Sequence, residues 1–185
     1  MFIIGRSVLD LIPNRIERKI KNRHNNIKIY PFAKIVHPEV IEIGEFSEID
    51  DFTFINGGNG IKIGRYVHIA SFVSIVGGGE LILGDYTVLA TGSRILTGTD
   101  SYYGGKRMST VVPAIQRNVI RGKTIIERDA FVGANVVVHP NVVIGEGAII
   151  GSNSLVLNNV QPWTINVGCP CKAIKMRPKI VENDI

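Results

Sequence analysis

Four histidines supply the imidazoles of this chain, and His68 is the one placed to act as a general base. It directly precedes Ile69, an aliphatic residue that should face a core, so its imidazole is expected to point outward near a corner. Imidazole exchanges protons near neutral pH, which suits it to activating a hydroxyl or an amine for acyl transfer. A surface or interface histidine is the alternative. His24, His37 and His139 lie in a polar linker or beside prolines and are expected to be structural.

Asp100 is the second candidate for this chemistry. A register of 20 residues places it in one column with Glu80 and Gly60, at the root of a segment that interrupts the repeats described below. A carboxylate there would orient His68 or hold the amine of an acceptor, or it would simply form a turn. The sequence leaves the base open between His68, Asp100 and a reaction that needs no side-chain base.

The elements that position these residues follow a six-residue repeat. Aliphatic residues recur at every sixth position, with a small or β-branched residue four positions after each, and segments starting at Ile43, Ile63 and Leu83 align at a spacing of 20. This period fits neither a helix nor an ordinary strand, but it suits a parallel β-helix in which each hexad forms one short strand and one corner. We therefore expect an all-β fold of about six coils over residues 29–160, with the aliphatics stacked inside as one column.

Two details of the repeat carry further expectations. Glycines that follow the aliphatics, such as Gly44 and Gly64, are expected to adopt a positive φ at tight corners. The uninterrupted run of inward aliphatics is expected to comprise Ile120, Ile126, Val132, Val138, Ile144, Ile150 and Val156.

The repeat is interrupted once, over about residues 97–118. An excursion of this length within a compact domain is usually functional or disordered. We interpret it as an extended loop that projects from the β-helix, whose coils form a prism, and covers a site or a neighbouring subunit. Its side chains Tyr102, Tyr103 and Lys106 are the candidates for substrate binding.

The two ends of the chain differ from the repeats. Residues 1–28 carry seven basic and two acidic side chains, whereas the remaining residues carry 14 of each sign. Ile12, Ile16 and Ile20 are spaced as on an amphipathic helix, with Pro13 in its first turn. This basic element is expected to cap the prism or, alternatively, to contact an anionic membrane surface. Residues 161–185 form the C-terminal tail.

Composition excludes several classes of protein. Hydrophobic residues make up 45% and charged residues 20%, which excludes an acidic disordered chain. The residues after residue 28 have balanced charge and no stretch of basic residues interleaved with aromatic ones, which is the pattern of a nucleic-acid binder. Cys169 and Cys171 are too close for an unstrained disulfide, and no Cys/His spacing suits a metal site. Without a signal or membrane-spanning segment, a bacterial cytoplasmic protein is expected, at most at the inner face of the membrane.

The hexads IGEGAII and IGSNSLV, followed by NNVQPWTINVGCPCKAIKMRP, resemble the left-handed parallel β-helix (hexapeptide-repeat) acyltransferases. The segments YVHIASFVSIVGGG and TGTDSYYGG resemble the branch of sugar O- and N-acetyltransferases that serves bacterial surface polysaccharides, such as O-antigen and capsule. The resemblance covers about residues 43–178. It implies a left-handed helix, a homotrimer, acetyl-CoA as donor, and active sites between adjacent subunits.

The resemblance also assigns residues to the cofactor. It implies that the pantetheine arm of CoA lies along a groove between prisms, where a backbone N–H serves as the oxyanion donor. Lys172, Lys175 and Arg177 would meet the CoA phosphates. The groove residues implied are Gly133, Ala134, Gly151 and Ser152.

In one respect the chain departs from the family. Many relatives carry a catalytic histidine where the excursion begins, or in an Asn-His pair one coil before the VHIA segment. Here residues 97–100 and 56–59 occupy those places without a histidine. A free amine is already partly neutral at pH 7, whereas a sugar hydroxyl depends more on a base. The missing histidine therefore tilts the prediction slightly toward an amino-sugar acceptor.

The predicted function is transfer of an acetyl group from acetyl-CoA to an amino or hydroxyl group of a sugar. The acceptor would be a nucleotide-linked amino sugar or a polysaccharide precursor. Two alternatives remain open from the sequence: a non-catalytic β-helix scaffold, and an acyltransferase for another small acceptor such as serine or an antibiotic.

Overall fold

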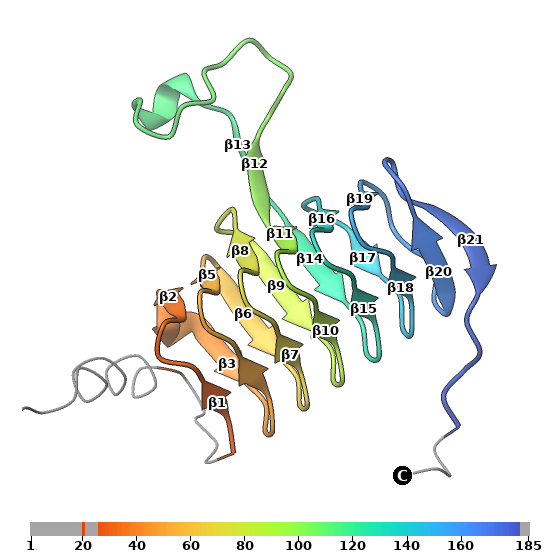
Figure 1. Cartoon of the computed structure of the whole chain (residues 1–185). Coiled ribbons are helices and arrows are strands. Elements are labelled where there is room, and N and C mark those ends of the chain that lie inside the picture. Colours follow the sequence, from red (N-terminus) through yellow and green to blue (C-terminus); the bar gives the residue numbers. More distant parts are fainter. Residues whose placement is uncertain (1–19, 21–25, 182–185) are drawn as a thin grey trace, which may run out of the picture.

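The protein is a triangular β-solenoid from which one long hairpin projects (Figure 1). The computed structural model describes residue 20 and residues 26–181. The predicted N-terminal helix falls outside these residues, apart from Ile20, which is buried in the core. Within the described part of the chain, no helix is long and apolar enough to span a bilayer.

Three parallel sheets form the walls of the prism, and each coil contributes one strand to each wall. Sheet 1 contains β1 (Lys28–Ile29), β4 (Glu48–Ile49), β7 (His68–Ile69), β10 (Val88–Leu89), β15 (Phe131–Val132), β18 (Ile149–Ile150) and β20 (Thr164–Val167). Sheet 2 contains β2 (Lys34–Val36), β5 (Phe54–Asn56), β8 (Ser74–Val76), β11 (Arg94–Leu96), β16 (Val137–Val138) and β19 (Leu155–Val156). Sheet 3 contains β3 (Ile41–Ile43), β6 (Gly60–Ile63), β9 (Glu80–Leu83), β14 (Lys123–Ile126) and β17 (Val143–Ile144).

Sheet 1 has seven parallel strands, so the solenoid has about seven turns, one more than expected. The extra turn comes from β20, which lies beyond the predicted end of the repeats. Three corners join the walls, and we call them the first (sheet 1 to sheet 2), second (sheet 2 to sheet 3) and third (sheet 3 to sheet 1) corners.

The aliphatic residues of the hexads form the core, as predicted. Ile63, Ile69 and Ile75 belong to one coil, and all are buried. The small residues four positions later are buried beside them: Ser47, Thr53, Val67, Val73, Thr87, Ser93, Thr124, Ala130, Val136, Val142, Ala148 and Ser154. The prediction fails at Ile120, which is exposed because it lies on the projecting hairpin. Because successive coils stack in register, the outward side chains of each wall also line up in columns along the solenoid axis.

The glycines after the aliphatics are required for a different reason than the one expected. Gly44 and Gly64 do not have a positive φ. A Cβ atom at Gly44 would lie 2.6 Å from the carbonyl carbon of Gly64 in the next coil. These glycines therefore permit the close approach of successive coils.

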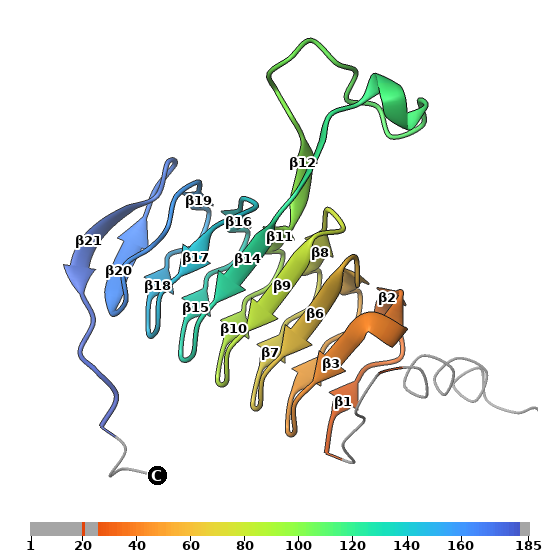
Figure 2. The ribbon, with the colours of Figure 1, turned by 180° about the vertical axis from the view of Figure 1, so that it is seen from behind.

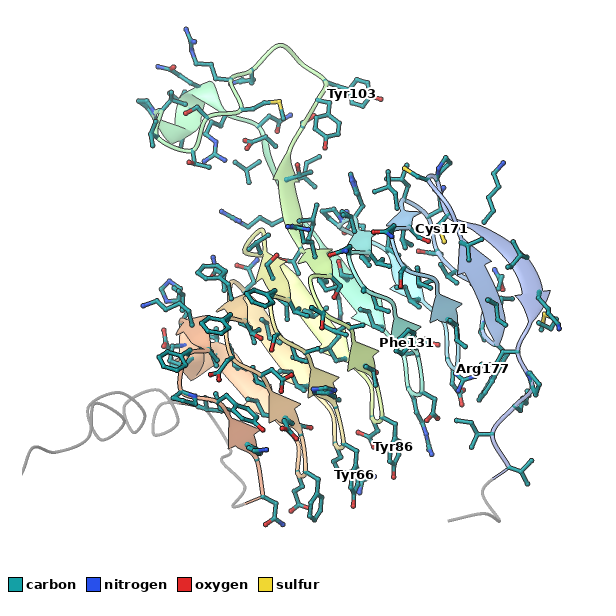
Figure 3. The ribbon with its side chains drawn as sticks, viewed as in Figure 1. Tyr66, Tyr86, Tyr103, Phe131, Cys171 and Arg177 are labelled. Atoms are coloured by element: carbon teal, nitrogen blue, oxygen red, sulfur yellow. The ribbon has the colours of Figure 1, made fainter. Side chains whose placement is uncertain are left out.

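The left-handed backbone falls on other corner positions, and in the N-terminal coils of the third and first corners it is taken by large aromatic residues. Phe46, Tyr66 and Tyr86 at the third corner have φ values of 60°, 56° and 61°. Phe52 and Phe72 at the first corner have φ values of 61° and 64°. Such a conformation costs a non-glycine residue about 1–3 kcal/mol. The rings of adjacent coils stack in ladders along both corners, and Figure 3 shows Tyr66 and Tyr86 side by side.

The excursion leaves the fourth coil at the second corner as an antiparallel hairpin, β12 (Gly98–Asp100) and β13 (Val119–Arg121). Both views show it standing away from the prism (Figures 1 and 2). The column position next to Glu80 is taken by Lys123 on β14, while Asp100 pairs with Val119 in the hairpin. The expected 20-residue register of Asp100 is thus wrong, because the chain turns outward before completing the coil. Two short 3-10 turns, Pro38–Val40 and Ala114–Gln116, complete the elements.

The C-terminal coil is closed by β21 (Lys172–Met176), which pairs antiparallel with β20. The guanidinium of Arg177 lies 5.6 Å from the centre of the Trp163 ring. Its Nη1 donates hydrogen bonds of 2.9 Å to the carbonyls of Asp129 and Gly147. Cys169 and Cys171 are free thiols, and burial raises the pKa of Cys171.

Candidate active site

The first corner carries the candidate base. His68 projects from β7 with its ring nitrogen Nε2 3.2 Å from Oδ2 of Asp50, which directly follows β4 in the preceding coil. The imidazole is 46% exposed and the carboxylate 25% exposed. A carboxylate beside an imidazole fixes the orientation of the ring, which is an arrangement that general bases use.

The groove residues assigned to CoA lie on the same corner, nearer the C-terminal end. Gly133 and Gly151 occupy successive coils, and the backbone N–H of Gly133 donates to the carbonyl of Ile150 at 2.8 Å. The backbone N–H of Asn153 donates to the carbonyl of Ala134 at 2.9 Å, which places Ser152 beside the same column. A Cβ at Gly133 would collide with the backbone of the coil above, so the corner is tight and narrow. The structure thus aligns His68 with all four groove residues along one edge.

The basic residues of the C-terminal tail have two different environments. Lys172 and Lys175 are exposed on β21, next to the C-terminal coils of sheet 1. Arg177 is held by the contacts to Trp163, Asp129 and Gly147 described above. Its Nη1 therefore serves to anchor the tail.

A polar cleft of about 580 Å³ lies at the second corner, at the root of the hairpin. Four glycines line it: Gly58, Gly77, Gly78 and Gly98. Its remaining lining residues are His37, Asn56, Asn59, Thr99, Asp100, Thr110, Arg117, Val119 and Arg121. Charged side chains beside glycine backbone suit a polar ligand.

Asp100 is paired within this cleft. Arg117 donates from Nε and Nη2 to the two carboxylate oxygens at 3.0 and 2.8 Å. These hydrogen bonds lower the pKa of Asp100 below the ordinary value for a carboxyl group, with a further contribution from Arg121. Arg121 itself donates to the carbonyl of Gly77. Asp100 is thus held ionised, which makes it a weak base whose charge is matched by Arg117.

The candidate substrate-binding residues lie farther out on the excursion. Tyr102 and Tyr103 are exposed, and Figure 3 shows Tyr103 at the outer part of the hairpin. Lys106 donates from Nζ to the carbonyl of Ile115 at 2.7 Å, which bridges the two arms of the loop. None of these three lines the cleft.

Within one chain, His68 and Asp100 are not brought together. His68 lies on sheet 1 beside Asp50, whereas Asp100 lies on the hairpin beside Arg117. The expectation that Asp100 orients His68 therefore does not hold within a single copy. Asp50 and Arg117 were missed from the sequence. Asp50 stands 18 residues before His68, close to one coil, and that spacing was the signal available.

The described residues contain no cluster of three or more His, Cys, Asp or Glu side chains placed to bind a metal ion.

Comparison with known proteins identifies the fold and the class. The family model "Bacterial transferase hexapeptide (six repeats)" matches residues 123–158. The chain is 35% identical over 164 residues to the Escherichia coli dTDP-4-amino-4,6-dideoxy-D-glucose acyltransferase, covering 88% of this chain and 85% of that enzyme.

Solved structures agree. AntD, an N-acyltransferase from Bacillus cereus in complex with dTDP and 3-hydroxybutyryl-CoA, superposes with a TM-score of 0.79 at 34% identity, covering 83% of this chain and 81% of AntD. A single-site mutant of AntD in complex with dTDP-4-amino-4,6-dideoxyglucose and coenzyme A gives a TM-score of 0.80 at 35% identity, covering 84% and 83%. The solenoid is thus the left-handed β-helix that the sequence resemblance implied, and the chain belongs to the hexapeptide-repeat acyltransferases.

Proposed function

We propose that the protein is an acyl-CoA-dependent N-acyltransferase whose acceptor is dTDP-4-amino-4,6-dideoxyglucose. The observation that carries this proposal is the similarity, at about a third identity over most of both chains, to two enzymes whose names specify N-acylation or that acceptor. The predicted O-acetylation of a polysaccharide has no comparable support.

The reaction needs one proton transfer. The neutral amine attacks the thioester carbonyl, the C–N bond forms, and the C–S bond breaks to release CoA as a thiolate. His68, oriented by Asp50, takes the proton from the amine and returns it to the departing sulfur. A backbone N–H of the Gly133–Ala134 corner stabilises the oxyanion that forms in between.

The acyl donor is a short-chain acyl-CoA. We expected acetyl-CoA from the sequence, and AntD is described with 3-hydroxybutyryl-CoA. The pantetheine arm runs along Gly133, Ala134, Gly151 and Ser152, with Lys172 and Lys175 near the phosphates. Acetyl-CoA and 3-hydroxybutyryl-CoA are therefore the two donors to compare in the first assay.

The complete site forms between copies in a homotrimer. Support comes from the separation within one chain: His68 and the groove residues share the first corner, while Asp100, Tyr102, Tyr103 and Lys106 belong to the hairpin at the second corner. The hairpin projects away from its own prism, which suits it to reach a neighbour's first corner (Figure 2). The hairpin then supplies acceptor contacts and the first corner supplies the base and the donor.

The base assignment is tested with His68→Asn. We expect kcat to fall about a hundredfold, since the proposed proton acceptor is gone. His139→Asn is the matched control, because His139 is a corner residue on another coil and should leave kcat unchanged. Full turnover of His68→Asn would leave the amine to react without a side-chain base and would remove His68 from this role.

A further inference from the structure

The first corner bears a ladder of three phenylalanines that stops abruptly. The ring centres of Phe32 and Phe52 are 5.7 Å apart, and those of Phe52 and Phe72 are 5.3 Å apart, with planes within 7° and 10° of parallel. The next position in this column is Gly92, which shares the left-handed backbone with a φ of 73°. Phe72 is 61% exposed, the highest of the three. The ladder therefore ends with an uncovered ring beside a missing rung.

The ladder at the third corner ends differently. There the rings of Phe46, Tyr66 and Tyr86 stack in the same way, but the guanidinium of Arg128 lies 5.3 Å from the centre of the last ring. The chain thus covers the end of one ladder with its own cation and leaves the end of the other to a glycine. An uncovered ladder end is therefore specific to the first corner and does not follow from the geometry of the coils in general.

Polar groups surround the missing rung. A Cβ at Gly92 would collide with Oδ1 of Asn135, so that amide leans over the glycine from the coil above. Arg94 donates from Nη1 to the carbonyl of Gly92 at 3.3 Å, which holds a guanidinium at the same edge. Successive coils are about 4.8 Å apart, so a single missing rung has the thickness of one saturated or aromatic ring.

The missing rung also lies between the two parts of the proposed reaction. His68 and Asp50 lie at the edge of the same corner toward the N-terminal coils. Gly133 and Gly151 continue the corner toward the C-terminal coils. A ring held on Phe72 would therefore lie between the base and the donor.

We infer that the exposed face of Phe72 above Gly92 is the platform for the pyranose ring of the amino-sugar acceptor. This inference rests on the proposed function and names the residue that would select its sugar. The C–H face of a 6-deoxy sugar packs on an aromatic ring, and its hydroxyls at the edge meet the Asn135 amide and the Arg94 guanidinium. The adenine of CoA is the weaker candidate, because Lys172 and Lys175, the proposed contacts of the CoA phosphates, lie on β21 at the far end of the solenoid.

The test compares Phe72→Ala with Phe52→Ala in steady-state kinetics with dTDP-4-amino-4,6-dideoxyglucose. Phe52 is the matched control, since it occupies the same column and the same left-handed backbone but lies inside the ladder. For Phe72→Ala we expect KM for the sugar nucleotide to rise about tenfold, because the apolar contact with the ring is lost. KM for acyl-CoA and the Kd of dTDP alone, measured by calorimetry, should stay unchanged, and Phe72→Tyr should restore the wild-type KM.

Three results would overturn the inference while the wild type remains active. The first is an equal change in KM for both alanine variants, which would make the ladder a structural element only. The second is a loss of dTDP or CoA affinity in Phe72→Ala, which would show that a nucleobase, and not the sugar, packs on the Phe72 ring. The third is a changed sedimentation coefficient for Phe72→Ala, which would show that Phe72 holds the neighbouring copy in the trimer and not the sugar. A wild-type protein that transfers no acyl group to this sugar would instead contradict the proposed function itself.

Discussion

Asp100 and Arg117 form a two-pronged ion pair that joins the end of β12 to the segment preceding β13, with N···O distances of 3.0 and 2.8 Å. The two residues lie 17 positions apart, so the pair closes the whole excursion. Arg121 on the same hairpin donates to Gly77 of the preceding coil and fixes the hairpin to the prism. Three charged side chains thus hold the excursion in place, although the excursion contributes nothing to the core.

Arg117→Met is expected to raise the pKa of Asp100 toward the ordinary carboxyl value of about 3.9. Arg117 is the main cause of the lowered pKa, and Met keeps the length of the side chain without its charge. The pair stabilises the folded hairpin above the pKa of an unpaired carboxyl, and this contribution is lost as the pH falls through the lowered pKa of Asp100. Carboxyl-carbon NMR titration of wild type and variant measures the shift, and identical titration curves would contradict the pairing.

Replacing residues 101–118 by an Asn-Gly turn is expected to leave the solenoid intact and to impair catalysis. Asp100 and Val119 are paired directly opposite each other, so a two-residue turn can close the shortened hairpin. We expect an unchanged urea midpoint and a KM for the sugar nucleotide raised about tenfold, since peripheral segments tolerate deletion while binding residues do not. A shortened variant with wild-type kinetics would show that the hairpin has no part in acceptor binding.

The solenoid was predictable because every coil repeats one rule. Ile69 and its equivalents must be apolar since each is enclosed by the coils on both sides, and this leaves a strict six-residue signal in the sequence. The rule fails where the chain leaves the prism. Ile120 keeps the spacing but lies on the hairpin, and Asp100 is displaced from its expected column for the same reason.

The site was less predictable than the fold, because its pairs are formed by residues without a periodic signal. His68 was proposed from its chemistry, but the contacts of Asp50 and Arg117 form only between coils or across the excursion. The aromatic ladders give a signal in hindsight: Phe52, Phe72 and Gly92 stand 20 residues apart, and the glycine breaks the series. A search for interruptions in the aromatic series would find surface features that a search for the six-residue aliphatic repeat misses.

Ser93→Ala is expected to stabilise the protein. Among the described residues, Ser93 has the one buried side-chain oxygen without a hydrogen-bond partner. Removing that unsatisfied hydroxyl should raise the free energy of unfolding by about 1 kcal/mol. Ser47→Ala is the opposite control, because Ser47 Oγ donates to the carbonyl of Gly64 and accepts from the N–H of Val67. Urea denaturation of both variants should give changes of opposite sign, and destabilisation by both would contradict the buried, unpaired state of Ser93.

Subunit mixing tests where the site is assembled. His68→Asn and the variant lacking residues 101–118 damage different halves of the proposed site. Unfolded together and refolded, they should recover roughly a quarter of the wild-type sites, because random trimers contain interfaces with both halves intact. Each variant refolded alone provides the baseline. Recovery no greater than that baseline would mean that each site lies within one chain.

The most direct test of the central claim is an acceptor comparison with purified protein and acyl-CoA, in which release of the CoA thiol is followed and the product is identified by mass spectrometry. We predict turnover with dTDP-4-amino-4,6-dideoxyglucose, a product heavier by one acyl group on nitrogen, and no turnover with dTDP-glucose, which offers only hydroxyls. Turnover with dTDP-glucose, or none with the amino sugar from either acetyl-CoA or 3-hydroxybutyryl-CoA, would contradict the account.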